Sequence, residues 1–308
     1  MKIVIVGGVA GGASAAARIR RLVDDAEIVI LERGPHVSFS NCSLPYYVGN
    51  VLQDSKTLLM MTPEAFRQRF HIQVRTDSEV CSIQREKKSV LVRSGNTGET
   101  YEETYDKLVL APGARPIRPQ KIPGTERPHV FTVRNVEDVE QIKRYLQSRQ
   151  VRQVTVVGGG FIGLEMVENL IRDGREVSLI EGSDQVMAPF DHDIVQILHK
   201  ELLDNGVKVH LSSMLREIGD TWVAAECGGV VTTIPAQAVI LALGITPESE
   251  LAAQAGLTVA KDHSIVVNHN FQTSDPDIYA VGDAIQSYDR LGQRPGRLAL
   301  AGPAQRQA

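Results

Sequence analysis

Two stretches of the chain show the same order of apolar and polar positions. Residues 3–6 and 154–157 are short runs dominated by β-branched residues, and each leads directly into a glycine-rich loop. A helix-compatible run follows each loop, and then a second apolar run, at residues 28–31 and 177–180. Short apolar runs without alternation are typical of strands buried on both faces of a parallel sheet. The pattern therefore predicts two strand–loop–helix–strand units.

Local signals predict the elements between and after these units. Thr62-Pro63-Glu64 marks a helix start, residues 72–92 alternate as strands do, and Ser94–Gly98 has the composition of a turn. Residues 115–128 are rich in proline, which is typical of a crossover between domains. Residues 241–247 repeat the strand-then-crossover order of residues 108–116. We expect an α/β fold with two Rossmann-like, doubly wound nucleotide-binding domains. The first comprises residues 1–115 plus 247–308, and the second, residues 116–246, is inserted into it.

The first glycine loop is Gly7-Gly8-Val9-Ala10-Gly11-Gly12, in which Val9 occupies the middle glycine position of G-x-G-x-x-G. Glycines allow a tight turn and a close approach of the backbone to a pyrophosphate at a helix N-terminus. Glu32 follows Gly12 by 20 positions, the spacing at which an acid meets an adenosine ribose hydroxyl. Strand, loop, alanine-rich helix and acid together predict a dinucleotide site.

The second loop, Gly158-Gly159-Gly160-Phe161-Ile162-Gly163, is a complete G-x-G-x-x-G. Glu181 ends the next strand, 18 positions after Gly163, and no arginine follows it immediately. An acid at this position accepts from a ribose 2′-hydroxyl and repels a 2′-phosphate, so the sequence favours NADH over NADPH.

Composition excludes several classes of function. With 308 residues the chain is long enough for two or three domains. Its 33 basic and 37 acidic residues give a net charge of −4 without a basic block, which disfavours nucleic acid or an anionic membrane as partner. No apolar run approaches the ~18 residues of a membrane span. The eight histidines show no metal-ligand spacing, so we expect no metal site.

The three cysteines, Cys42, Cys81 and Cys227, lie far apart without a C-x-x-C pair, which indicates a reducing compartment, the cytoplasm. Cys42 has no second thiol at the spacing of a dithiol, since Pro45 and Tyr47 occupy those positions. A redox role for Cys42 therefore requires a mixed disulfide with a substrate thiol or a sulfenic acid. An unpaired cysteine by itself is more often a small buried apolar residue. We expect Cys81 to be structural and assign no role to Cys227.

The run Ser38-Phe39-Ser40-Asn41-Cys42-Ser43-Leu44-Pro45-Tyr46, after the first glycine loop, resembles the single-cysteine branch of the flavoprotein disulfide reductases. Within that branch it is most similar to coenzyme A disulfide reductases and NADH-dependent persulfide reductases. The resemblance extends over essentially the whole chain. It implies that FAD binds the first unit and NADH the second, and that Cys42 forms a mixed disulfide with coenzyme A.

The resemblance also implies roles for individual residues. The flavin-binding positions are Gly7, Gly8, Gly11, Gly12, Glu32, Arg33, Val80, Ala111, Gly113 and Asp283, the last of which matches a residue that holds a ribitol hydroxyl. The NADH-binding positions are Gly158, Gly160, Phe161, Gly163, Glu165 and Glu181, with Phe161 matching an aromatic gate over the flavin. The substrate-binding positions are Ser14, Arg18, Arg21, Ser38 and Asn41. Alternatives stay open, because a solvated basic helix face explains either arginine, a core aromatic explains Phe161, and a surface acid explains Glu165.

These assignments predict an FAD-dependent NADH:disulfide oxidoreductase that reduces a small disulfide or persulfide of coenzyme A. Ala10 stands where similar peroxidases and NADH oxidases carry a histidine, which favours disulfides over oxygen. Two alternatives remain: an NADH oxidase that cycles Cys42 through a sulfenate, and a non-catalytic protein that binds flavin and NAD. Homodimeric relatives continue with a C-terminal dimerisation domain. We expect this chain to lack that domain and to be monomeric.

Overall fold

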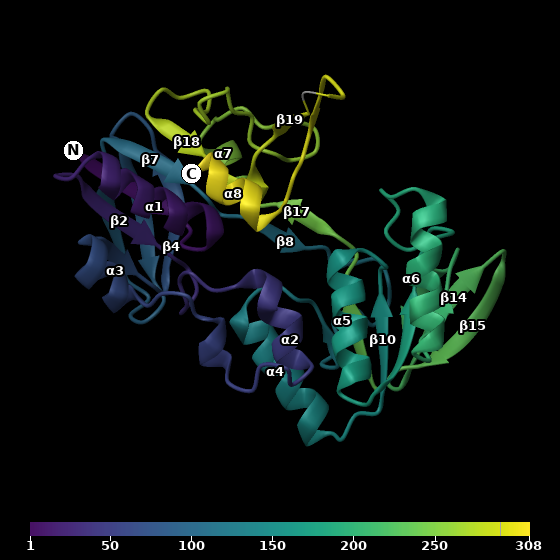
Figure 1. The fold of residues 1–308 in the computed structure, drawn as a ribbon. Helices are drawn as coiled ribbons and strands as arrows, with labels where there is room; N and C mark the ends of the chain where they lie inside the picture. Colours follow the sequence, from purple (N-terminus) through teal and green to yellow (C-terminus); the bar gives the residue numbers. More distant parts are fainter. Residues whose placement is uncertain (290) are drawn as a thin grey trace. The chain divides into compact units, whose positions relative to one another are not determined.

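The computed structural model describes residues 1–289 and 291–308, which form two compact units. The first unit comprises residues 1–39, 59–115 and 246–308, and the second comprises residues 40–58 and 116–245 (Figure 1). The boundaries after residues 115 and 245 lie within one residue of those expected from the sequence. Residues 40–58, which the sequence placed in the first domain, group instead with the second unit.

The first unit is built on a five-stranded parallel sheet in the order β18-β7-β1-β2-β3. These strands are β1 (Lys2–Val6), β2 (Glu27–Leu31), β3 (Gln73–Arg75), β7 (Lys107–Leu110) and β18 (Ile278–Ala280). The register pairs Val6 with Leu31 and with Leu110, so three strands end together at one edge. The order reverses beside β1, which is where doubly wound sheets bind nucleotides.

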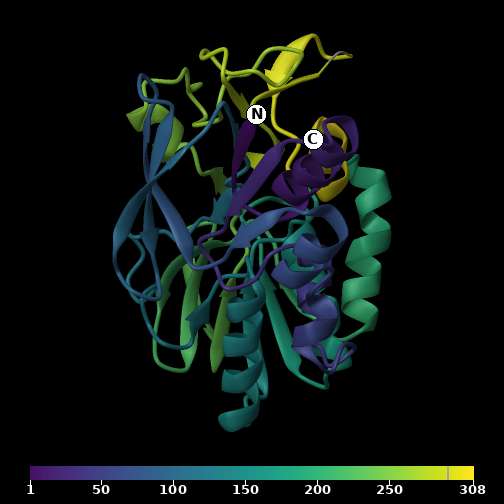
Figure 2. The same cartoon turned by 90° about the vertical axis from the view of Figure 1, so that its left-hand side faces the viewer.

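Alternating side chains of β1 enter two different cores. Ile3 and Ile5 pack with Ala15 and Ala16 of helix α1 (Ala10–Leu22) and with Phe66 of α3 (Pro63–Phe70). The opposite face, which includes Val4, packs on a three-stranded antiparallel sheet (Figure 2). That sheet contains β4 (Ser78–Gln84), β5 (Ser89–Ser94) and β6 (Thr100–Thr104). The predicted cap of α3 is present, since the Thr62 side chain accepts from the Ala65 amide.

The second unit repeats this arrangement with a parallel sheet in the order β12-β11-β10-β16-β9. Its strands are β9 (Val130–Phe131), β10 (Gln153–Val157), β11 (Glu176–Ile180), β12 (Lys208–His210) and β16 (Ala238–Leu241). One face packs on an antiparallel sheet of β13 (Met214–Ile218), β14 (Trp222–Cys227) and β15 (Val230–Pro235). Helices α4 (Val136–Ser148), α5 (Phe161–Arg172) and α6 (His192–Asp204) complete the unit.

The segment of residues 40–58 contains η1 (Asn41–Ser43), α2 (Leu44–Val48) and η2 (Ser55–Leu58). Helix α2 lies against α4 and α5, and its residues Leu44 and Val48 are buried. This packing explains the difference from the expected boundaries, because an apolar helix face joins whichever unit covers it.

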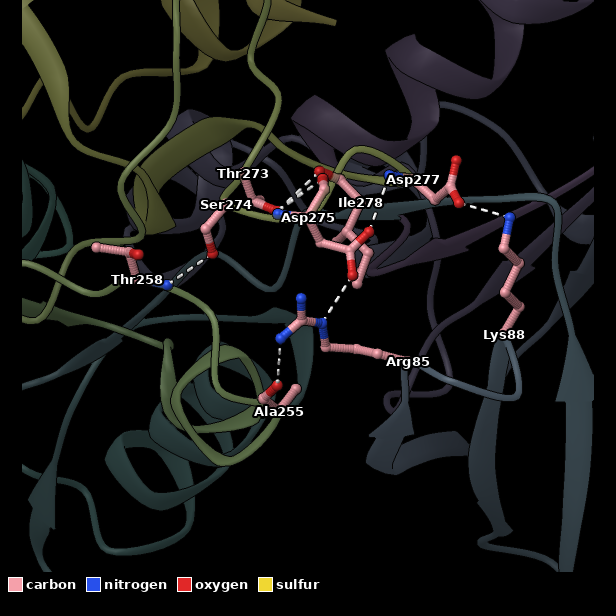
Figure 3. Close-up of polar contacts among 9 residues, drawn as sticks. All are labelled: Arg85, Lys88, Ala255, Thr258, Thr273, Ser274, Asp275, Asp277 and Ile278. Atoms are coloured by element: carbon pink, nitrogen blue, oxygen red, sulfur yellow. Dashed lines mark hydrogen bonds and ion pairs between the residues drawn. The ribbon is translucent and has the colours of Figure 1, made fainter.

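The return segment completes the first unit with α7 (Glu250–Gln254), β18, η3 (Gly282–Ala284), β19 (Ser287–Asp289), β20 (Arg294–Gly296) and α8 (Ala301–Gln307). Strands β8 (Ala114–Pro116) and β17 (Ile245–Pro247) pair where the chain crosses between units. Arg85, between β4 and β5, donates to Asp275 at 2.7 Å and to the carbonyl of Ala255 at 3.4 Å (Figure 3). Nearby, Lys88 pairs with Asp277 at 2.5 Å. These contacts fasten the return segment to the antiparallel sheet of its own unit.

Within the described part of the chain, no helix is both long and apolar enough to cross a membrane.

Candidate functional site

The loop between β1 and α1 is held by two very close backbone contacts. Gly7 has φ +92°, and a Cβ on it would lie 2.2 Å from the carbonyl oxygen of Ala111. A Cβ on Gly12 would lie 1.9 Å from the carbonyl oxygen of Gly7. Both distances are far below van der Waals contact, so only glycine fits at either position. The contact at Gly12 brings the start of α1 against the strand end, as a dinucleotide site requires.

Glu32, which follows β2, is hydrogen-bonded to this loop. Its carboxylate accepts from the amide of Gly8 at 2.8 Å and from the amide of Gly34 at 2.9 Å. The carboxylate therefore ties the glycine loop to the end of β2. An acid oriented in this way is at the position that accepts from a ribose hydroxyl in dinucleotide folds.

The loop between β10 and α5 has the same construction. A Cβ on Gly158 would lie 2.3 Å from the carbonyl oxygen of Ala242, and one on Gly163 would lie 1.9 Å from that of Gly158. Glu181 accepts from the amide of Gly159 at 2.6 Å and from that of Ser183 at 2.8 Å. The glycines thus make the same close backbone contacts in both predicted nucleotide loops. In both, a carboxylate at the end of the next strand accepts from two backbone amides, an arrangement that we call the acid clamp.

Both loops fit the group that the sequence assigns to them. Neither α1 nor α5 has a side-chain cap at its N-terminus, so backbone N–H groups there are left for an anion. A Cβ on Gly160, the N-cap of α5, would meet no atom within 4 Å. Internal packing among the described residues therefore does not require glycine at this position.

Two of the predicted NADH-binding residues lie on the first turns of α5. Phe161 is 57% exposed and meets Phe190 edge to face at 6.2 Å. Such exposure excludes the core aromatic alternative for Phe161. Glu165 is half-buried, and burial, with a smaller contribution from Glu168, raises the pKa of its carboxyl. The structure therefore disfavours a fully solvated surface acid at this position.

The predicted flavin-binding residues beyond the first loop all lie in the first unit. Asp283 is in η3, directly after β18, and burial raises the pKa of its carboxyl. Ala111 and Gly113 follow β7, and Gly113 has φ +75°. Val80 is half-buried on β4 and packs against the core. Arg33 forms a two-point ion pair with Glu248, with both N–O distances 2.8 Å, so its charge is already engaged within the unit.

The predicted substrate residues on α1 divide by their contacts. Arg18 and Arg21 are exposed and have no hydrogen bond or ion pair with other described residues, while Ser14 is half-buried. Arg20, which the sequence did not single out, instead donates to the carbonyls of Phe70 and Ala26. The structure thus separates one structural arginine from two that are available for a ligand.

Cys42 is exposed in η1, next to the exposed Asn41. The hydroxyls of Ser40 and Ser43 hydrogen-bond at 2.7 Å across this turn. In the first unit, Ser38 has φ +51° and donates its amide to the carbonyl of Gly8 at 2.8 Å. Ser38 is therefore placed by the nucleotide loop itself, a contact that the sequence pattern did not indicate.

Two further features could mark a second functional site: the other cysteines and a cluster of metal-binding side chains. Cys81 is half-buried on β4, and Cys227 is exposed at the end of β14, beside the tight turn Gly228-Gly229. Among the described residues, no group of three or more histidine, cysteine or acidic side chains could hold a metal ion.

Comparisons with known proteins agree with this geometry. The family model of the pyridine nucleotide-disulphide oxidoreductases matches residues 1–308. The coenzyme A disulfide reductase of Staphylococcus epidermidis is 37% identical over 307 residues, which are 100% of this chain and 68% of that protein.

Two solved structures are similar over the length of this chain. Reduced CoADR-RHD of Bacillus anthracis is 45% identical, with a TM-score of 0.96, over 99% of this chain and 55% of the other. An NAD-dependent persulfide reductase from A. fulgidus is 34% identical, with a TM-score of 0.94, over 100% of this chain and 57% of the other. The chain therefore spans little more than half of each. The similarities confirm the predicted α/β fold class and the cofactor pair FAD and NAD(H). The chain belongs to the pyridine nucleotide-disulphide oxidoreductase family.

Proposed function

We propose that this chain carries the catalytic core of an NADH-dependent flavoprotein disulfide reductase that acts on a disulfide or persulfide of coenzyme A. The observation that carries the proposal is the duplicated nucleotide loop, with the same glycine contacts and the same acid clamp in both units. Two such loops serve two dinucleotides, and the exposed thiol of Cys42 completes the set of groups that the chemistry needs. The relatives named above support the choice of substrate class.

In this proposal, FAD belongs to the first unit and NADH to the second. Gly7, Gly8, Gly11 and Gly12 form the pyrophosphate cradle for FAD, Glu32 receives its ribose, and Asp283 receives a ribitol hydroxyl. Gly158, Gly160 and Gly163 do the same for NADH, beside Phe161 and Glu165. When bound, the two cofactors supply the electron pair that returns Cys42 to its thiolate. Each glycine loop exposes backbone donors at a helix N-terminus, where a diphosphate is best stabilised.

Glu181 gives the second loop its preference for NADH. Its carboxylate is already fixed by the amides of Gly159 and Ser183, so it cannot move aside easily for a 2′-phosphate. The negative charge repels such a phosphate, whereas the free ribose 2′-hydroxyl can donate to it.

Cys42 is the proposed catalytic residue. Its thiolate attacks one sulfur of the disulfide, a Cys42–coenzyme A disulfide forms, and the first coenzyme A leaves as a thiolate that takes a proton from solvent. Two electrons and a proton then release the second coenzyme A thiol and restore the Cys42 thiolate. Each cycle thus consumes one NADH and one further proton, and yields two thiols.

The substrate is proposed to lie along the side of α1 that carries Ser14, Arg18 and Arg21. These residues are spaced by four and three positions, so they share one helix face. Two exposed guanidinium groups without ion-pair partners among the described residues are suited to the phosphates of coenzyme A. Asn41 and Ser38 are proposed to flank the reacting sulfur. The dependence on a reduced thiol makes the cytoplasm the proposed compartment.

The test is an anaerobic assay of the flavin-loaded protein with NADH and coenzyme A disulfide, comparing Cys42→Ser with Cys227→Ser. We expect Cys42→Ser to lose at least about 100-fold in turnover, because the nucleophile is removed. Cys227→Ser should match the original protein, since it changes an equally exposed cysteine at the end of β14. Full turnover by Cys42→Ser would refute the mechanism.

Oxygen consumption distinguishes the proposed disulfide reductase from the alternative NADH oxidase. Without any disulfide, Cys42-dependent oxygen consumption at the rate of disulfide turnover would favour the NADH oxidase. Failure of NADH to bleach bound flavin would favour a non-catalytic binding protein. The absence of a histidine at Ala10 leads us to expect slow oxygen consumption that is unaffected by Cys42→Ser.

A further inference from the structure

The cysteine segment, residues 40–58, is fastened to the second unit through α2. Helix α2 begins two residues after Cys42 and lies against α4 and α5 of that unit (Figure 1). The segment is joined to these helices by contacts at Tyr47, Gly49 and Asn50, none of which involves the glycine loops directly.

The first contact is between Gly49 and Asn169. Gly49 ends α2 with φ −79°, a conformation open to any residue, so its backbone angles do not require glycine. A Cβ on Gly49 would nevertheless lie 2.6 Å from both the Cβ and the carbonyl oxygen of Asn169. The only role for glycine that the structure shows here is this close approach of α2 to α5.

Asn169 is itself unusual for an interior residue. It is 1% exposed, and its amide nitrogen donates to the carbonyl of Glu165 at 2.8 Å, but its Oδ1 is buried without a hydrogen-bond partner among the described residues. Leaving a buried acceptor unpaired is unfavourable. An apolar side chain would therefore serve the stability of α5 better, which points to a function for Asn169 at the Gly49 contact.

Lys143 of α4 makes the second contact. Its ammonium lies 3.9 Å from the centre of the Tyr47 ring and 3.4 Å from the carbonyl oxygen of Leu52. The residue is only 9% exposed, and burial lowers the pKa of its amine. A cation held over an aromatic face away from water is a specific, directional contact. The Lys143 contact holds the segment on the side of α2 that faces α4.

Asn50 makes the third contact, at the C-terminal end of α5. Asn50 has φ +57°, and its side chain donates to Asp173 at 2.5 Å. Asp173 is fixed in turn by Arg175, whose Nε donates to it at 2.8 Å. Helix α2 is thus held by α4 and by α5, and Asn50, which follows it, is held at the C-terminal end of α5.

We propose that Gly49, Asn169 and Lys143 are positioning residues that set the location of Cys42 by clamping its segment to α4 and α5. The proposal rests on the proposed function, in which Cys42 is the nucleophile. Helix α5 also begins at the loop assigned to NADH, with Phe161 and Glu165 on its first turns. One rigid helix therefore carries both the NADH-binding residues and the anchor of the cysteine segment.

The experiment compares two variants with matched controls in the flavin-loaded chain. Gly49→Ala forces α2 away from α5, and its control is Gly296→Ala, where a Cβ would meet no atom within 4 Å. Lys143→Met keeps the length of the side chain but removes the cation, and its control is the exposed Lys121→Met. Each variant is reduced, freed of reductant, and mixed once with coenzyme A disulfide while release of the first thiol is timed.

We expect about tenfold slower thiol release in Gly49→Ala and about threefold slower release in Lys143→Met, because small misplacements of a reacting group are costly. Amide hydrogen exchange over residues 44–50 should accelerate by about tenfold as the clamp loosens. The affinity for NADH should stay within about twofold, and the controls should match the original protein. If Gly49→Ala does not fold, Lys143→Met decides.

Two results would overturn the positioning role. Unchanged thiol release in both folded variants would do so, even if hydrogen exchange accelerates, because the contacts would then be purely structural. A parallel loss of NADH affinity would do so as well, since the defect would then lie in the second unit as a whole. The activity of Cys42→Ser tells this failure from that of the proposed function. If that variant is inactive while the clamp variants are normal, only the clamp is wrong.

Discussion

The two nucleotide loops agree at their outer glycines and differ at the middle one. Gly7 and Gly158, like Gly12 and Gly163, are fixed by backbone oxygens at nearly equal distances, so chain packing dictates all four. The middle position is Val9 in the first loop and Gly160 in the second, where a Cβ would meet open space. The comparison teaches that one sequence motif combines two physical requirements. The outer glycines serve the fold, and the middle one is left for the proposed ligand.

Replacing the last glycine of either loop should give the largest effect, and the effect should be equal in the two units. In Gly12→Ala and in Gly163→Ala the new methyl group overlaps a backbone carbonyl at 1.9 Å, which a side-chain shift cannot relieve. We expect each to lower the free energy of unfolding by about 4 kcal/mol or more, measured by urea denaturation. Gly302→Ala, in open space, is the control. A clear inequality between Gly12→Ala and Gly163→Ala would break the equivalence of the loops.

The middle position should behave in the opposite way. Gly160→Ala should raise stability slightly, by up to about 1 kcal/mol, because the unfolded chain loses freedom while the folded backbone is unstrained. The same change should weaken NADH binding by about tenfold, or about 1.4 kcal/mol, measured by fluorescence titration. Val9→Gly in the first loop should lower stability slightly and leave NADH binding unchanged. Weaker stability of Gly160→Ala with unchanged NADH binding would assign Gly160 to the fold.

The smallest effect concerns the half-buried carboxyl in each unit. Burial raises the pKa of Asp283 in the first and of Glu165 in the second, so the folded protein favours their protonated forms. The ionised form of each carboxyl costs stability, and that cost disappears as the pH falls through its raised pKa. Asp283→Asn and Glu165→Gln should therefore each raise the melting temperature of cofactor-free protein at pH 7 by about 1–2 °C.

The gain should fade as the pH falls through the raised pKa of each carboxyl, because the acid and its amide replacement are then both uncharged. A gain that persists at low pH would mean that the substitution acts through packing. With cofactors present the variants should diverge, since Asp283→Asn should release FAD more readily, while Glu165→Gln should leave FAD content unchanged. The matched pair thus tests the assignment of one cofactor to each unit.

Most of the fold could be predicted because its signals are local. The strands before Gly7 and Gly158 and the helix start at Thr62-Pro63-Glu64 lie where the sequence placed them. The acids Glu32 and Glu181 followed from spacing alone, and the structure adds their amide partners.

What the sequence could not show are contacts between distant residues. The α2 segment was placed in the first unit, because nothing local reveals that it packs on α4 and α5. In the same way, the three arginines of α1 look alike in sequence. Only tertiary contacts to Phe70 and Ala26 show that Arg20 is structural while Arg18 and Arg21 are not so engaged. The ion pair of Arg33 with Glu248 spans 215 positions and is equally invisible to a motif.

The passage of residues 40–58 through the second unit has a consequence for building chimaeras between relatives. The chain passes from one unit to the other four times, after residues 39, 58, 115 and 245. A transplanted second unit cut only at residues 116 and 245 would carry Asn169 and Lys143 to face a foreign α2. Since a Cβ at position 49 would lie 2.6 Å from Asn169, a foreign α2 without glycine there would be displaced, so the donor's own α2 should travel with its unit. The exchangeable unit is therefore two pieces of sequence, and one of them contains the thiol.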